Sequence, residues 1–457
     1  MAVELISFAA YLPSGRLAPT DVGGRAGGRD RVVASFDEDS TTMAVEAAAR
    51  ALRRIDTAAD PATVLLATTS PAYADKTNAV AVHAALDLPR SAFCADLVGG
   101  GRSSVAALRL VSRDGGIAVM SDVRVGRPGS EDEKLGGDGA AAFVFADTAE
   151  TGDGVAAVIG TASVSAEFLD RWRDPRSEVG EQWEERFGVE QYTPLVREAA
   201  AAALACAGIE SADHVVIACP NSGIAKRAAT LVTGVVSTTT STVGHSGAAD
   251  LGVALAAALD GAGRDQSILV VSAVDGCDAL VLRTLPGIER LGTQPTVAEQ
   301  RSSGTAVRYL DYLSWRGLLD KQPPRRPEPD RPAGPPSRRS VAWKFSLTGS
   351  RCTVCDFLHL PPARVCRGCG TTDAMRPESA RSTSGTVVTS TIDRLAYSPA
   401  PPVVEVVVDF DGGGRTTLEV ADAAPDGVGV GARVTPTFRR LFTAGGVHNY
   451  FWKARTA

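Results

Sequence analysis

Hydrophobic stretches alternate with alanine-rich amphipathic stretches along the first 320 residues. Apolar runs of strand length are Thr63–Ala67, Gly116–Met120, Ala140–Phe145, His214–Ala218 and Ser267–Val271. Segments with helical periodicity lie between them, namely Thr41–Leu52, Ser103–Val111, Pro194–Ala205 and Asp250–Leu259. Continuous apolar strands that alternate with helices predict an α/β fold whose sheet is covered on both faces.

The order of these elements repeats within the 320 residues. The strand TVLLATTS is followed by the glycine turn and helix GGGRSSVAALRL and then by the strand GIAVMSDV. Later in the chain HVVIACPNS is followed by VGHSGAADLGVALAAAL and then by SILVVSAV. The recurrence predicts a duplicated α/β core with halves 1–160 and 161–320, and chance likeness between generic α/β units is the alternative.

A proline-rich stretch follows this region. Gln322–Ser340 carries seven of the chain's 26 prolines and shows no apolar periodicity. This composition predicts an extended, semi-rigid linker over 321–340. A proline-rich ligand for another domain is the alternative.

The strongest motif lies directly after the linker, in two CxxC pairs. Cys352 and Cys355 are separated by ten residues from Cys366 and Cys369. Two such turns present four thiolates, which complete the tetrahedral shell of a Zn²⁺ ion and leave no open position. The spacing therefore predicts a zinc ribbon over 341–375 whose metal is structural.

The last part of the chain has the alternation of short strands. The segments are Gly385–Ile392, Pro402–Phe410, Arg415–Val420 and Arg433–Phe438, separated by Gly, Asp and Pro turns. They predict a small β-barrel of the OB type over 376–457.

Charge and composition narrow the function and the compartment. Residues 1–320 hold 28 Lys and Arg against 41 Asp and Glu, so nucleic-acid binding is disfavoured there. The 457-residue chain has no apolar run long enough to span a bilayer and no basic leader, which predicts a cytoplasmic protein with no membrane partner. Eight cysteines are too few for a disulfide scaffold.

Two positions in the large region are candidates for chemistry. Gly99, Gly100 and Gly101 form a strand-to-helix turn whose N–H groups are a candidate anion site or oxyanion hole, although such glycines also simply permit tight turns. His245 stands at the matching turn of the second half, where it is either a general acid or base or a structural histidine.

The large region resembles the archaeal and bacterial hydroxymethylglutaryl-CoA synthases of the thiolase superfamily. The stretches that carry the resemblance are Phe36–Leu52, Thr68–Val82, Leu135–Asp147, Glu184–Tyr192, Ser241–Leu255 and Arg308–Gly317. The tail is similar to the zinc-ribbon and OB-fold proteins that accompany such enzymes. The resemblance implies an α/β/α/β/α core, an acyl-CoA substrate and a homodimer, with the tail docked to help cover the acyl-CoA channel.

The residues that such enzymes use in catalysis are missing at the matching positions. The family's Glu corresponds to Thr69, its Cys nucleophile to Gly99 and its His to Ala218, while an Asn of the second half corresponds to His245. A Claisen condensation through an acyl-enzyme needs a thiolate, which glycine cannot supply.

Two other thiols lie near the vacant positions. Cys94 precedes the glycine turn by five residues, and Cys219 follows Ala218; each is either a substitute nucleophile or a buried structural thiol. Asn221 and Gly244 are expected to contact the substrate.

These departures leave two main hypotheses. The first is an enzyme that makes or cleaves carbon–carbon bonds of acyl-CoA thioesters by an aldol-type step, with His245 as acid or base and the Gly99–Gly101 turn as donor to the enolate. The second is a catalytically inactive subunit that binds acyl-CoA or serves as a scaffold. Nucleic-acid binding by the tail is weaker, because the tail has a small net charge and no aromatic stacking series.

Overall fold

The computed structural model describes residues 3–55, 61–148, 154–232, 234–237, 243–423 and 426–456. Ser241 and Thr242, which begin one of the stretches discussed above, lie outside the described residues. The chain divides into two compact units. The first comprises residues 1–34, 39–80 and 89–312, and the second comprises residues 35–38, 81–88 and 313–457. Among the described residues no helix is both long and apolar enough to cross a bilayer.

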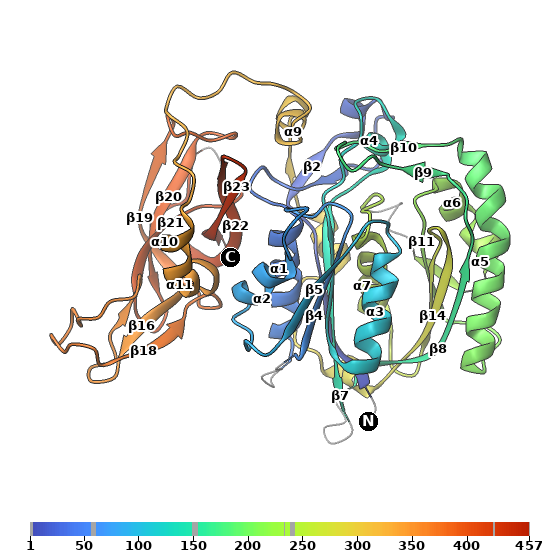
Figure 1. The fold of residues 1–457 in the computed structure, drawn as a ribbon, viewed down its shortest axis with the longest axis horizontal. Coiled ribbons are helices and arrows are strands. Elements are labelled where there is room, and N and C mark those ends of the chain that lie inside the picture. Colours follow the sequence, from blue (N-terminus) through green and yellow to red (C-terminus); the bar gives the residue numbers. More distant parts are fainter. Residues whose placement is uncertain are drawn as a thin grey trace. The chain divides into compact units, whose positions relative to one another are not determined.

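A ten-stranded sheet is the framework of the first unit (Figure 1). Its order is β12-β11-β13-β14-β8-β1-β7-β6-β4-β5. The strands are β1 (Val3–Tyr11), β4 (Thr63–Thr68), β5 (Phe93–Val98), β6 (Gly116–Asp122), β7 (Gly139–Asp147), β8 (Ala156–Ser165), β11 (His214–Ala218), β12 (Val235–Ser237), β13 (Ser267–Ser272) and β14 (Gly276–Thr284).

The sheet consists of two copies of one five-stranded pattern. The strand order β5-β4-β6-β7-β1 corresponds to β12-β11-β13-β14-β8, and the copies meet where β1 pairs with β8. In each copy the first three strands are parallel and the last two run antiparallel to their neighbours. The predicted duplication of the α/β core is therefore confirmed. The predicted boundary between the halves, at residue 160, falls inside β8.

Four long helices cover and separate the two halves of the sheet. They are α1 (Ser40–Arg53), α3 (Ser103–Asp114), α5 (Glu185–Ala207) and α7 (Ala249–Gly261). Helix α1 packs on β1, β6 and β7, whereas α5 packs on β8 and β14. Helices α3 and α7 pack against each other and against strands of the sheet, within one continuous apolar core. The result is a layered α/β/α/β/α arrangement.

The predicted strands and helices of this unit all form, with one substantial change of boundary. Helix α5 begins at Glu185, nine residues before the predicted start at Pro194. Proline usually opens a helix because it has no N–H to donate, but Pro194 lies inside α5. The shorter elements are α2 (Ala79–Ala85), α4 (Glu131–Leu135), α6 (Ser222–Leu231), α8 (Val297–Ser302), α9 (Tyr309–Trp315), β2 (Gly15–Leu17), β3 (Arg31–Val33), β9 (Arg171–Trp172), β10 (Glu181–Gln182) and β15 (Thr305–Ala306).

The second unit contains the linker and a small three-stranded sheet. The sheet order is β17-β16-β18, with β16 (Thr348–Cys352), β17 (Leu358–His359) and β18 (Met375–Ser379). Two short helices precede it, α10 (Gly334–Arg339) and α11 (Val341–Ser346). The prediction of an extended linker is therefore wrong for α10. Its two prolines occupy the first turn, where a missing N–H costs no hydrogen bond.

A five-stranded barrel completes the second unit. Its order is β21-β20-β19-β22-β23, with β19 (Gly385–Asp393), β20 (Val403–Phe410), β21 (Arg415–Glu419), β22 (Arg433–Ala444) and β23 (Val447–Thr456). A bridge between Val420 and Ala454 closes the barrel. The first four strands match the predicted segments, and β23 was not predicted.

Candidate functional site

Two related turns meet at the centre of the first unit. The turn Gly99–Arg102 leads from β5 into α3, and the turn Gly244–Ala248 leads into α7. The Ser104 hydroxyl is 3.0 Å from the Gly101 carbonyl and 2.5 Å from the Ala248 carbonyl. A Cβ placed on Gly101 would lie 3.7 Å from the Gly247 carbonyl oxygen. The duplication thus brings the two predicted functional turns into contact.

His245 is held in a defined orientation beside this junction. Its backbone N–H donates to the Leu135 carbonyl at 2.8 Å, and its carbonyl accepts from the Gly137 N–H at 3.1 Å. The imidazole Nδ1 lies 3.4 Å from Oδ2 of Asp250, and the side chain is 13% exposed. Among the described residues Nε2 has no hydrogen-bond partner, so this nitrogen is available for proton transfer.

The His245 side chain faces a small polar cavity of about 160 Å³. Charged side chains from several elements line it together with His245. They are Arg124, Glu131, Asp132, Asp170, Arg171, Glu184, Glu185 and Lys226. Its polar lining makes the cavity a place for proton transfer or for ionic recognition.

Asp132 and Arg171 form an ion pair in this cavity. Arg171 donates to both carboxylate oxygens of Asp132, with Nη1 at 2.8 Å from Oδ2. Burial alone would raise the pKa of Asp132, but the hydrogen bond and charge of Arg171 outweigh it and hold that pKa below its ordinary value. Asp132 is therefore a stable anion beside His245.

Asp170 has the opposite environment in the same cavity. Asp170 is 8% exposed, and burial raises the pKa of its carboxyl, although a hydrogen bond from Tyr192 acts against this shift. The Tyr192 hydroxyl is 3.2 Å from Oδ1 of Asp170. Two carboxyl groups whose pKa values shift in opposite directions are a typical arrangement for acid and base roles.

Asn221 and Gly244 are both constrained by contacts within the protein. Asn221 lines it, but its amide donates to the Glu185 carbonyl at 2.9 Å and its oxygen accepts from the Gly223 N–H at 3.0 Å. Gly244 has φ +101°, and a Cβ there would lie 2.2 Å from the Gly136 carbonyl oxygen. Only glycine fits this position, independently of any contact with a ligand.

The turn Gly99–Gly101 does not line the cavity in front of His245. Gly99 has φ +118°, and a Cβ added there would meet nothing within 4 Å. A Cβ on Gly100 would lie 3.2 Å from a carboxylate oxygen of Asp275. Because negative charge is already present beside the turn, its surroundings oppose a role as an oxyanion hole.

The two candidate thiols are poor nucleophiles where they stand. Cys219 is 2% exposed, and burial raises its pKa well above the ordinary value. Cys94 is half-buried on β5, and burial together with the charge of Asp96 raises its pKa as well. A nucleophilic cysteine requires the thiolate, so both environments oppose covalent catalysis.

Thr69, the predicted counterpart of the Glu in the related synthases, is bound to a buried carboxylate. Its N–H and its hydroxyl each donate to Asp122 at 2.7 Å. Asp122 also accepts from the Ala248 N–H at 2.6 Å, at the start of α7. Nη1 of Arg124 approaches the Thr69 hydroxyl at 3.3 Å. This position therefore links β4, β6 and α7.

Sequence reasoning missed most of the charged residues in the cavity. Asp132 lies on α4, Asp170 in the loop before β9 and Arg171 at the start of β9, and Arg124 follows β6. Their sequence neighbourhoods are rich in other charged residues, so no spacing distinguishes them. The structure unites them with His245 and Asn221 but leaves Gly99–Gly101 and Cys94 outside.

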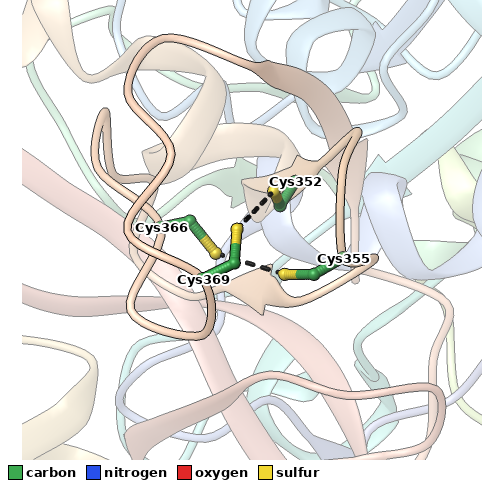
Figure 2. Close-up of side chains that lie close together, drawn as sticks. All are labelled: Cys352, Cys355, Cys366 and Cys369. Atoms are coloured by element: carbon green, nitrogen blue, oxygen red, sulfur yellow. Dashed lines mark hydrogen bonds between the residues drawn. The ribbon is translucent and has the colours of Figure 1, made fainter.

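The second unit contains a cluster of four cysteines (Figure 2). The sulfur atoms of Cys352, Cys355, Cys366 and Cys369 all lie within 4.8 Å of one another. The Cys352–Cys369 pair is separated by 3.8 Å and the Cys355–Cys366 pair by 3.4 Å. A tetrahedron with Zn–S bonds of about 2.3 Å has S–S edges of about 3.8 Å, so the four thiols fit zinc.

Backbone groups support the same interpretation of the cluster. The N–H of Val354 points at the Cys352 sulfur at 3.4 Å, and the N–H of Gly368 at the Cys366 sulfur at 3.3 Å. Such N–H groups stabilise thiolate charge. The four cysteines could therefore hold a metal ion without rearrangement.

Comparison with known proteins agrees with both units. Residues 378–439 match the family model "ChsH2, C-terminal OB-fold domain", which confirms the OB-fold prediction. The hydroxymethylglutaryl-CoA synthase of Archaeoglobus fulgidus is 28% identical over 346 residues, covering 69% of this chain and 98% of the relative. The chain is similar to the hydroxymethylglutaryl-CoA synthases. Its resemblance to that group is thereby confirmed.

Two further matches extend the comparison. A solved structure described as HMG_CoA synthase complexed with CoA aligns with a TM-score of 0.59 at 16% identity, covering 68% of this chain and 89% of the other. It shows the shared thiolase-like fold. A "DUF35 domain-containing scaffold protein" of Methanothermobacter thermautotrophicus is 27% identical over 121 residues, covering 25% of this chain and 90% of that protein.

Proposed function

We propose that the first unit binds an acyl-CoA thioester and makes or cleaves a carbon–carbon bond of the acyl group by an aldol-type step. Similarity to hydroxymethylglutaryl-CoA synthases over most of this unit supports the substrate class. The observation that carries the proposal is His245, beside the Asp250 carboxylate, in one cavity with the raised-pKa carboxyl of Asp170.

The reaction proceeds without an acyl-enzyme. Glycine stands at position 99, the predicted counterpart of the Cys in the related enzymes, and the pKa values of Cys94 and Cys219 are raised. An aldol-type step needs no nucleophile on the protein. It needs a group that accepts the hydroxyl proton, a group that protonates carbon, and positive charge near the enolate.

The cavity residues supply these groups in the cleavage direction. His245 Nε2 accepts the proton of the β-hydroxyl, the O–H electron pair forms the new carbonyl, and the Cα–Cβ bond breaks. Its electron pair passes into the thioester enolate, close to the Arg124 guanidinium. Asp170 then protonates Cα, and exchange with water restores both side chains. The products are an aldehyde or ketone and a shorter acyl-CoA.

Turnover by paired histidine variants tests this role. The full chain is incubated with a panel of β-hydroxyacyl-CoA thioesters, and the shorter acyl-CoA is quantified. His245→Ala is expected to lower kcat by about 100-fold or more, in the range of general acid–base catalysis. His214→Ala is the matched control, because His214 lies on β11 and bonds Gln266 at 2.9 Å. Full activity of His245→Ala would contradict the assignment.

A non-catalytic, thioester-binding subunit is the second candidate. The cavity volume of about 160 Å³ is below the range of about 300–1,000 Å³ typical of ligand pockets, and the Asp132–Arg171 pair occupies one side. The likeness to a scaffold protein also favours this alternative. Calorimetric binding of acyl-CoA thioesters with no turnover of any panel member would support it.

The four-cysteine cluster is proposed to hold one structural Zn²⁺. The fit of the sulfur positions to a tetrahedron supports this assignment. Four protein ligands leave no position for substrate, so the ion stabilises the ribbon and takes no part in the reaction.

A homodimer is proposed to form through the edge strand β5. This strand ends the ten-stranded sheet, and Phe93 and Val98 are 62% and 57% exposed. An exposed apolar edge strand is a ready template for pairing with a second copy. Light scattering is expected to give the mass of two chains, and of one chain for Phe93→Glu. A cytoplasmic location stays a prediction.

A further inference from the structure

A groove of about 720 Å³ lies wholly within the second unit, in a part of the molecule that the proposed reaction does not use. One wall is the linker segment from Lys321 to Arg326. The other is the loop that joins β19 to β20, from Arg394 to Pro401. The volume falls within the range of about 300–1,000 Å³ that is usual for small-molecule sites.

The groove has a one-sided charge. Lys321, Arg325, Arg326 and Arg394 line it, and its lining contains no Asp or Glu. Among the described residues Arg325, Arg326 and Arg394 have no carboxylate partner. Three such arginines around one groove favour a ligand that carries several negative charges, and Arg recognises phosphate oxygens in particular.

Several arginines elsewhere in the second unit differ in this respect. Arg364 pairs with Asp373, Arg415 with Asp409 and Arg433 with Asp411. Carboxylates therefore offset the charge of these three exposed arginines, whereas none in the described part of the chain offsets Arg325, Arg326 or Arg394.

Apart from Ser314, Gln322 and Ser398, the remaining lining is apolar, and it includes a single aromatic ring. Leu395 is 69% exposed, Tyr397 is half-buried, and Pro323, Pro324 and Pro399 add flat apolar surface. A ring of this kind stacks on a nucleobase. Since one aromatic side chain accommodates one base, the groove favours a mononucleotide over a nucleic-acid strand.

We propose that this groove binds the phosphorylated end of a nucleotide, with the phosphates on Arg325, Arg326 and Arg394 and the base on Tyr397. Two sources have this chemistry, a free nucleoside diphosphate and the 3′-phospho-ADP end of CoA. The second source rests on the proposed function, in which the chain acts on CoA thioesters.

Calorimetry on the full-length protein tests the site with CoA, ADP, inorganic phosphate and a single-stranded oligonucleotide as separate probes. Arg394→Glu is expected to weaken nucleotide binding at this site by about tenfold or more, because it replaces attraction with repulsion. Tyr397→Ala is expected to weaken binding of ADP but not of phosphate. Arg338→Glu is the matched control, since it makes the same charge change at an exposed linker residue outside the groove.

The outcomes separate the sources and the alternatives. Tighter binding of CoA than of ADP that Arg394→Glu weakens identifies CoA as the ligand of the groove, and equal binding identifies the diphosphate group that both contain. Equal affinity for inorganic phosphate and ADP, tighter binding of the oligonucleotide, or nucleotide binding that Arg394→Glu leaves unchanged would each overturn the proposal. Turnover by the His245 variants is measured separately, so failure here is distinguishable from failure of the proposed reaction.

Discussion

The Nδ1 atom of His245 lies 3.4 Å from a carboxylate oxygen of Asp250, the second residue of α7. Asp250 is 1% exposed, and its other oxygen is 3.3 Å from the N–H of Ser246. The carboxylate therefore lies beside both the turn and the ring. This places a buried negative charge next to the imidazole that is proposed to act as acid or base.

Asp250→Asn is expected to lower kcat without a matching change in KM. The amide preserves the size of the side chain but removes the negative charge beside the ring. The expected loss is about 10- to 100-fold, measured by steady-state kinetics on the thioester that the wild type cleaves. If the loss of kcat came from unfolding, the circular dichroism spectrum would change as well. An unchanged kcat would contradict this positioning role.

Gly244→Ala is expected to destabilise the first unit by about 3 kcal/mol or more, because a Cβ combines a positive φ with a clash against the Gly136 carbonyl. Gly99→Ala is the matched control. It has a similar φ but open space, so only the backbone strain of about 1–2 kcal/mol remains. Denaturant unfolding measures both variants, and equal losses would show that the close approach at Gly244 is not a constraint.

Arg171→Ala is expected to cost about 3 kcal/mol at neutral pH, because it leaves the Asp132 charge in the cavity without its partner. Arg171 holds the pKa of Asp132 below its ordinary value, so this stability is present above pH of about 4 and is lost as pH falls through the native pKa. The difference between wild type and variant should thus shrink in acid. Arg176→Ala, which breaks an exposed pair, should change little at any pH.

Asp170→Asn is expected to become more stable relative to the wild type as pH rises from about 4 to 7. Burial raises the native pKa of Asp170, so its contribution to stability is present below the unfolded pKa and is lost as the buried carboxyl ionises. The Asn oxygen can still accept from Tyr192. Unfolding free energies at several pH values measure the trend, with Asp265→Asn at an exposed position as the control. A difference independent of pH would contradict the raised pKa.

Cys355→Ser is expected to abolish zinc binding and to lower the unfolding temperature of the second unit, while the first unit unfolds as before. Metal analysis of the purified wild type should give one zinc per chain. Cys206→Ser is the matched control, because Cys206 is an exposed thiol on α5 outside the cluster. A wild-type protein purified without zinc, or a fully loaded Cys355→Ser variant, would contradict the assignment.

The fold could be predicted from sequence to the extent that it depends on local periodicity. Apolar runs such as Thr63–Ala67 and Ser267–Val271 became central strands, and the repeat of strand, turn and helix became the two matching halves of the sheet. The CxxC pairs were equally informative because metal ligands have fixed spacing. The start of α5 was missed because tertiary packing retains Pro194 inside a helix that local rules would begin there.

The candidate site could be predicted only in part. His245 and Asn221 stand in recognisable turns, and the structure places both at the cavity. Asp170, Asp132 and Arg171 were not identifiable because their roles arise from burial and from partners far away in sequence, which no local pattern records. Conversely, the glycines at 99–101 gave a clear sequence signal, but the neighbouring Asp275 carboxylate opposes the anion-binding role expected of them.

The central claim, carbon–carbon chemistry on a CoA thioester without an acyl-enzyme, is tested most directly by mass spectrometry. The purified full chain is incubated with a panel of β-hydroxyacyl-CoA and β-ketoacyl-CoA thioesters, and both the small-molecule products and the intact protein are weighed. We predict that a β-hydroxyacyl-CoA is converted to a shorter acyl-CoA and a carbonyl product while the protein mass is unchanged. An acyl adduct on Cys94 or Cys219, or bound thioester with no turnover across the panel, would contradict this account.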